Sequence, residues 1–301
     1  MFFCSTKQRR NKTVRMHAPV QPDPDWIVGK HALMNVHARF QNGRTEIEPH
    51  SWRIPFQWQG CHYQDHDDEP FMLLLNSAGG FVEGDVSEFH ATLDAGTRAL
   101  FTTTASTKFY KCVGQETSRE IVDILVGPEA LLEYCPDEAI PYERSRAQRI
   151  NRITMDESSR LFATDMISAG RIHYGDGEAF KFDSMMSEFE IRLGNRTIAL
   201  DRLLATTPEA IAAMPRLWHG AFHMATVFGY APDLARDMED EVFAHVEDVE
   251  ETQIGVSRIG NLVIVRILAK ETWQAHEAMY NAWRALRPSI AGKPARPISK
   301  C

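Results

Sequence analysis

The stretch NSAGGFVEGDVSEFHATLDAGTRALFTTTASTKFYK, residues 76–111, decides the fold class of this chain. It begins with a glycine-rich turn at 76–85. Small and apolar residues then alternate with mostly polar ones along 86–93, and this period of two is typical of a half-buried β-strand. A turn at 94–97 leads into a second extended run at 98–104. The stretch therefore predicts two β-strands joined by a tight turn.

The same pattern continues along most of the chain. Further extended runs lie at 117–126, 131–134, 149–155 and 161–167. Two hairpins are expected, one over 189–200 around Gly194-Asn195 and one over 254–267 around Gly260-Asn261. Strands do not alternate with helices, which argues against a doubly wound nucleotide-binding fold. The sequence thus predicts a mainly β protein.

Two helices are expected in the last hundred residues, at 234–246 and 271–286, with Pro288 ending the second. The first lies within 233–251, a segment with nine acidic residues and one basic residue, Arg236. Its outer face is either a solvated surface or a docking face for a basic partner.

The second helix carries an aromatic stripe. Trp273, Tyr280 and Trp283 fall near one of its faces. Such a stripe is either packed in the core or forms a groove for a partner helix.

Composition limits the class of function. A chain of 301 residues with 44% hydrophobic residues can bury a large core, and its net charge of -8 argues against nucleic-acid binding. Its five cysteines form no CxxC pair, so neither a disulfide framework nor a zinc knuckle is expected. No apolar run reaches the roughly 20 residues that cross a bilayer, which predicts a cytoplasmic protein that binds no membrane. We expect a flexible basic tail at 1–27 and a single β-rich domain at 28–301.

Known catalytic patterns fit poorly. The glycines of 79–84 match neither GxGxxG nor a phosphate-binding P-loop. Ser106 and Lys108 suggest an amide hydrolase, but an SxxK motif needs serine where Ala105 stands. The hydrolase is therefore the less favoured alternative.

One dense group of potential metal ligands lies at 61–69, where His62 and His66 stand among acidic residues and Cys61. Imidazole and carboxylate suit nickel or zinc, so a freestanding nickel- or zinc-binding protein is a second alternative. A polar loop insertion explains the same residues more simply.

Four segments together resemble the urease accessory protein family UreD, also called UreH. The block AGGFVEGD at 78–85 and the strand TTTASTKFYK at 102–111 are similar to two of its motifs, with Ser106 in place of the usual alanine and Lys111 in place of arginine. The segment LEYCPDEAI at 132–140 resembles its LEWLPQ motif, with Cys135 and Asp137 as departures. The segment GRIHYGDGEAF at 170–180 resembles a further motif but is two residues longer.

The resemblance implies a non-enzymatic chaperone of urease maturation. Its fold would be a flattened, β-helix-like stack of strands with two C-terminal α-helices. Its partners would be apo-urease, a helical UreF-like accessory protein and, through that complex, a UreG-like GTPase. It would have no cofactor of its own, and nickel would pass in transit on the way to the urease active site.

The family motifs also indicate site residues. We expect Asp85, Glu138 and either Asp176 or Glu178 to line a path for nickel, because weak oxygen ligands bind a passing cation without trapping it. The alternative is that each acid caps a turn or pairs with an arginine such as Arg144 or Arg171. The other motif residues are expected to be structural: Gly79, Gly80, Gly84, Thr103, Thr107, Lys108, Tyr110, Gly170 and Arg171.

Overall fold

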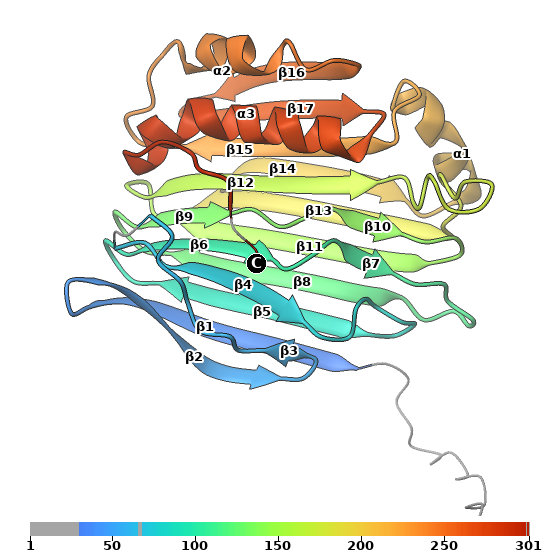
Figure 1. Ribbon diagram of the computed structural model, residues 1–301, viewed down its shortest axis with the longest axis horizontal. Coiled ribbons are helices and arrows are strands. Elements are labelled where there is room, and N and C mark those ends of the chain that lie inside the picture. The colour runs from blue at the N-terminus through green and yellow to red at the C-terminus, as the bar shows by residue number, and fades with distance from the viewer. Residues whose placement is uncertain (1–29, 66–67, 299, 301) are drawn as a thin grey trace, which may run out of the picture.

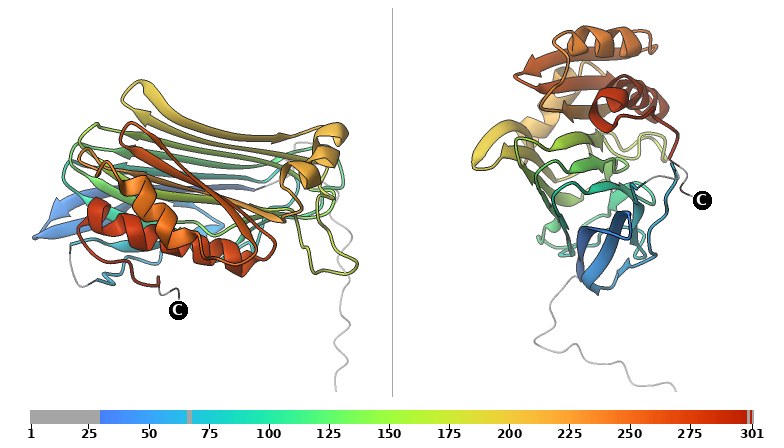
Figure 2. Two further views of the ribbon diagram at one scale, coloured as in Figure 1. Left: turned by 90° about the horizontal axis from the view of Figure 1, so that it is seen from above. Right: turned by 90° about the vertical axis from the view of Figure 1, so that its left-hand side faces the viewer.

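The computed structural model of the protein describes residues 30–65, 68–298 and 300. Two large β-sheets lie face to face, and two helices cover the outer face of one of them (Figures 1 and 2). The segment 1–27, predicted as a basic tail, lies outside the described residues.

The first sheet has seven strands in the order β14-β13-β11-β8-β5-β1-β2. Their bounds are β1 (His31–Gln41), β2 (Arg44–Arg53), β5 (Val86–Leu93), β8 (Ser118–Val126), β11 (Arg146–Met155), β13 (Ser184–Leu193) and β14 (Arg196–Ala205).

The second sheet has ten strands, eight of them in the order β16-β17-β15-β12-β9-β6-β4-β3, with β7 and β10 branching from β12. Their bounds are β3 (Phe56–Gln57), β4 (Phe71–Asn76), β6 (Arg98–Thr103), β7 (Thr107–Phe109), β9 (Leu131–Tyr134), β10 (Ala139–Pro141), β12 (Arg160–Ser168), β15 (His223–Tyr230), β16 (Thr252–Ile259) and β17 (Leu262–Ala269).

The chain coils from one sheet to the other. β5 follows β4, β6 follows β5, and the alternation continues through β8, β9, β11, β12 and β13. Successive turns of the coil therefore pair in parallel within each sheet, as β5 does with β8 and β6 with β9. This confirms the predicted β-helix-like stack.

Most predicted strands lie where the period of two places them. β5 begins and ends as predicted, and its inward side chains Ser87, Phe89, Ala91 and Leu93 are buried. Both hairpins are present, as the antiparallel pairs β13–β14 and β16–β17.

The described residues form three helices, where two were predicted. The additional one, α1 (Pro208–Leu217), begins with Thr207 as its N-cap and has Pro208 in its first turn. The other two are α2 (Met238–Val246) and α3 (Thr272–Ala291). On α2, the acidic residues Asp240 and Glu241 are exposed.

The prediction that Pro288 ends the last helix was wrong. Pro288 lies inside α3, which continues to Ala291 and ends at Gly292 in the left-handed conformation. Proline removes one backbone hydrogen bond, and the buried side chains of Ile290 and Ala291 offset this loss in the final turn.

The aromatic stripe of α3 is split between two environments. Trp283 is buried against Phe162 of the ten-stranded sheet, whereas Trp273 is 57% exposed. Trp283 is therefore a core residue, and Trp273 lies on the surface.

Aromatic side chains fill much of the space between the sheets. Phe89 contacts Phe101 edge-to-face, and Phe189 stacks on Phe228. Burying each such side chain contributes about 1.5–3 kcal/mol. Among the described helices, none is long and apolar enough to cross a membrane.

Candidate functional site

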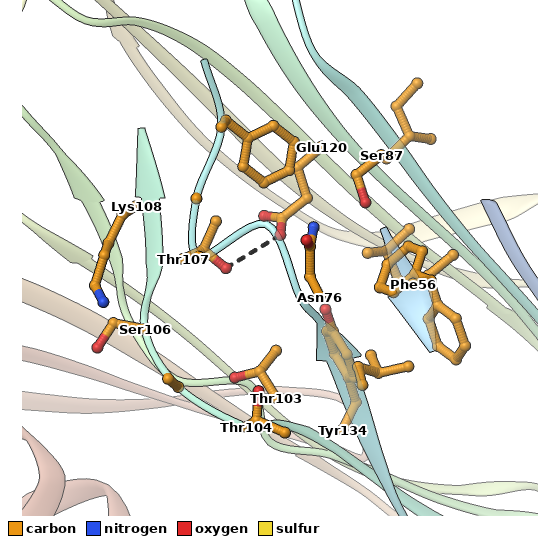
Figure 3. Close-up of a pocket in the computed structure, with 18 residues that line it drawn as sticks. Phe56, Asn76, Ser87, Thr103, Thr104, Ser106, Thr107, Lys108, Glu120 and Tyr134 are labelled. Carbon is orange, nitrogen blue, oxygen red and sulfur yellow. Dashed lines mark hydrogen bonds between the residues drawn. The ribbon is translucent and has the colours of Figure 1, made fainter. Parts of the chain in front are cut away.

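A pocket of about 130 Å³ opens between the two sheets, and both halves of the 76–111 stretch line it (Figure 3). Gly79, Gly80 and Phe81 come from the glycine-rich turn, and 103–108 come from the end of β6 and the start of β7. Its wall combines apolar rings with hydroxyls, the amide of Asn76, the Lys108 side chain and the Glu120 carboxylate. The coil therefore brings together two motifs that lie about 20 residues apart in the sequence.

The glycine turn fits closely against β7. A Cβ atom at Gly80 would lie 2.8 Å from the carbonyl oxygen of Lys108 and 2.8 Å from the ring of Tyr110. The Tyr110 hydroxyl in turn donates a 3.1 Å hydrogen bond to the carbonyl of Gly79. Gly80 is therefore required by close packing, whereas Gly79 and Gly84 have positive φ angles of 73° and 76°.

Two carboxylates adjoin the pocket and accept hydrogen bonds from its hydroxyls. Thr107 donates to Glu120 at 3.3 Å, and Ser106 donates to Glu138 at 2.7 Å. Thr103 accepts a 2.9 Å hydrogen bond from the backbone N–H of Asp137 and so fixes the segment that carries Glu138. Each carboxylate is the first member of a separate line of side chains that contact one another through polar atoms.

The first line leads outward to α3. The second oxygen of Glu138 lies 3.0 Å from Nε2 of His276, which lines another pocket of about 170 Å³ under α3. Burial opposes ionisation of Glu138, but the hydrogen bonds from His276 and Ser106 outweigh it and lower its pKa to about 2. Glu138 is therefore a carboxylate at neutral pH, placed between the two pockets.

A second histidine, His223, is buried close to this line. Its ring nitrogens contact Ser168 at 2.8 Å and Thr272 at 3.3 Å. Burial lowers its pKa to about 4, so the ring is neutral at pH 7.

The other line leads into the interior of the sandwich. Glu120 on β8 lies beside Arg149 on β11, and the Arg149 Nε donates to it at 2.7 Å. Arg149 Nη1 donates across the interior to Asp165 of β12, also at 2.7 Å. Burial raises the pKa of Asp165, and its contact with Arg149 opposes this rise.

The line continues in register across the far strands. Asp165 lies beside Thr226 of β15, which lies beside Arg266 of β17. Asp201 of β14 accepts hydrogen bonds from Thr226 at 2.8 Å and from Arg266 at 2.7 Å. A layer of polar side chains thus extends from the pocket through the sandwich to the half-exposed Arg266.

Three of the four predicted acids have fixed partners. Asp85 is 5% exposed and accepts hydrogen bonds from the backbone N–H groups of Lys30 at 2.6 Å and Val82 at 2.9 Å. Glu178 forms a two-point ion pair with Arg171, which also lies over the rings of Tyr142 and Tyr174.

Glu138 is the third, as described above, and Asp176 is exposed. Gly170 allows the 170–178 loop to close, because a Cβ there would meet the carbonyl oxygen of Glu178. Among the described residues, the hydrogen bonds of Asp85, Glu138 and Glu178 go to partners other than these four acids.

The described residues contain no group of three or more His, Cys, Asp or Glu side chains that could hold a metal ion. For the proposed 61–69 cluster, His62 forms an isolated β-bridge with Phe71, Asp65 pairs with Arg287 and Lys293, and His66 lies outside the described residues. For the hydrolase alternative, the group that accepts the Ser106 hydroxyl hydrogen is the Glu138 carboxylate, and its low pKa of about 2 makes it a weak base for activating a nucleophile.

Sequence reasoning missed Glu120, Arg149, Asp165 and His276. Glu120 and Arg149 occupy inward positions of period-two strands, so a charged residue among alternating buried positions is the signal that could have found them. Asp165 lies on β12, which is buried throughout 161–168, so its signal is a charged residue inside a continuous buried strand. His276 is four residues after Thr272 on α3, which places both on the face that meets the sheet.

Comparisons with known proteins identify the family of this chain. The UreD urease accessory protein family model matches residues 30–299. The chain is 27% identical over 280 residues to urease accessory protein UreD 2 of Brucella abortus, covering 89% of this chain and 91% of that protein. It is 24% identical over 297 residues to urease accessory protein UreD of Delftia acidovorans, covering 93% and 96%. The chain therefore belongs to the UreD urease accessory protein family.

Proposed function

We propose that this chain is a scaffold that binds apo-urease, a UreF-like protein and, through that complex, a UreG-like GTPase, and that it helps deliver nickel to the urease active site. Its family is one of accessory proteins, non-catalytic by name, which supports a role in urease maturation. Nickel is the cargo in this proposal and is held only in transit.

The observation that carries the proposal is the position of Glu138. One of its oxygens faces Ser106 in the inter-sheet pocket, and the other faces His276 in the pocket under α3. Imidazole and carboxylate are donors that suit nickel. A pair with only two such donors binds a cation weakly, and a carrier must also release its cargo.

The contacts divide the predicted nickel residues into two groups. Glu138 keeps its proposed role, and His276 and Glu120 join it. For Asp85 and Glu178, the backbone and arginine partners favour the structural alternative.

The test uses Glu138→Gln and His276→Gln in cells that express urease with its accessory proteins. We expect less nickel per urease while co-purification of the chain with urease and the accessory proteins is retained. Glu129→Gln, an exposed acid elsewhere on the body, is the matched control and should leave nickel unchanged. Normal nickel in both site variants would remove the assigned path.

A further inference from the structure

Arg149 divides the polar layer of the sandwich into two parts. The residue is 1% exposed and donates at 2.7 Å to Glu120 and at 2.7 Å to Asp165. Glu120 lines the inter-sheet pocket, whereas Arg149 and Asp165 are not part of its wall. A cation that enters the pocket therefore meets Glu120 first and the guanidinium directly behind it.

The guanidinium keeps its charge at this place. Burial opposes the charged form, but Asp165 and Glu120 outweigh it and raise the pKa of Arg149 above its ordinary value. Positive charge is thus stabilised between two carboxyl groups in the interior, and the same charge repels an incoming cation.

Two buried polar groups with an unpaired atom lie beside Arg149. Ser187 is adjacent to it in the register of β11 and β13 and is 3% exposed. In the described part of the chain its hydroxyl has no hydrogen-bond partner, and neither does the side-chain amide nitrogen of Asn151, two residues along β11. Buried polar atoms are rarely left unpaired, so the Ser187 oxygen is available to contact a further group. The Asn151 nitrogen is a hydrogen-bond donor and does not ligate a cation.

We propose that Glu120 and Asp165 are ligands of a divalent-cation site inside the sandwich, and that the Arg149 guanidinium fills this site in the resting protein. The interior is closed to cations while Arg149 bridges the two acids. It opens when the guanidinium turns away, and the Ser187 hydroxyl then supplies a further oxygen. This inference rests on the proposed function only for the identity of the cation, which is nickel.

The test is calorimetric titration of the isolated full chain with Ni²⁺ alone. Arg149→Gln should bind Ni²⁺ roughly tenfold more tightly or better than the unmodified chain, because a like charge has been removed from the site. The gain should disappear when Glu120→Gln and Asp165→Asn are added. Arg152→Gln is the matched control, since Arg152 is on the same strand but pairs with Asp123 at the surface.

A second variant covers the case in which Arg149→Gln does not fold. Arg149→Met combined with Asp165→Asn removes one positive and one negative side chain, and so keeps the formal charge of the layer. It should still bind Ni²⁺ more tightly than the unmodified chain, through Glu120.

A folded Arg149→Gln chain that binds Ni²⁺ no better than Arg152→Gln would overturn the proposal. That result would leave the proposed function standing if Glu138→Gln still lowered the nickel content of urease. If Arg149→Gln instead bound Ni²⁺ more tightly and Glu138→Gln left the nickel content of urease normal, the assigned nickel path would be removed and the cation site kept.

Discussion

Arg149 on β11 and Asp165 on β12 join the two sheets of the protein through a 2.7 Å hydrogen bond that is buried in the interior. Glu120 accepts a second hydrogen bond from the same guanidinium. Buried ion pairs are costly to desolvate, so their presence among the aromatic core residues suggests a role other than stability.

Removing Arg149 alone should destabilise the protein. Arg149→Met leaves two buried carboxyl groups without their partner, and we expect the free energy of unfolding to fall by about 3–5 kcal/mol in urea denaturation. Adding Glu120→Gln and Asp165→Asn should restore most of this loss. Arg152→Met, at an exposed pair, should change stability by less than about 1 kcal/mol. If Arg149→Met and Arg152→Met lowered the free energy of unfolding equally, Arg149 would not be the partner of two buried carboxyl groups.

Gly80 lies too close to β7 to accept a larger side chain. Gly80→Ala places a Cβ 2.8 Å from the Lys108 carbonyl oxygen, so the turn must move and stability should fall by about 1–3 kcal/mol. Gly255→Ala is the control, because nothing lies within 4 Å of the added atom there. Thermal unfolding of the two variants measures the difference, and equal melting temperatures would argue against the packing.

Stability should depend on pH through His223. Its pKa falls from 6.5 to about 4 on folding, so between these values the unfolded chain binds a proton that the folded chain does not. The contribution is therefore complete above pH 6.5 and is lost as the pH falls, by about 3 kcal/mol near pH 4.

His223→Gln should flatten the pH dependence of the unfolding free energy over this range. The exposed His50→Gln should leave it unchanged. If the unfolding free energy of His223→Gln depended on pH as steeply as that of the original chain, other groups would cause the acid sensitivity.

Asp85 is buried and hydrogen-bonded, whereas Asp176 is exposed, so replacing them should affect stability differently. Asp85→Asn places an amide N–H against a backbone donor, so the unfolding free energy should fall by about 1–3 kcal/mol. Asp176→Asn should have no measurable effect on stability, because this side chain is exposed. Chemical denaturation compares the two, and an Asp85→Asn chain as stable as the original would reopen its role with nickel.

The strands were predictable because their signal is local. Inward and outward positions alternate along β5 whatever the strand pairs with, so its bounds and buried face followed from period two. The extension of α3 past Pro288 depends on where Ile290 and Ala291 pack, which a local proline rule does not contain.

The candidate site was only partly predictable for a related reason. The motifs pointed to Glu138 and to the stretch that lines the pocket. The partners of Glu138 and Glu120, namely His276 and Arg149, lie 138 and 29 residues away along the chain, and only the stacking of the coil brings them together. The pairing register between distant strands cannot be predicted from the sequence of any one segment.

The nickel content of urease measures the role of this chain in maturation when the enzyme is purified from cells that express all other urease genes with or without the chain. Urease made without the chain should lack most of its nickel, and supplying the chain should restore it. Urease with a full complement of nickel in the absence of the chain would show that the chain is not needed for nickel delivery.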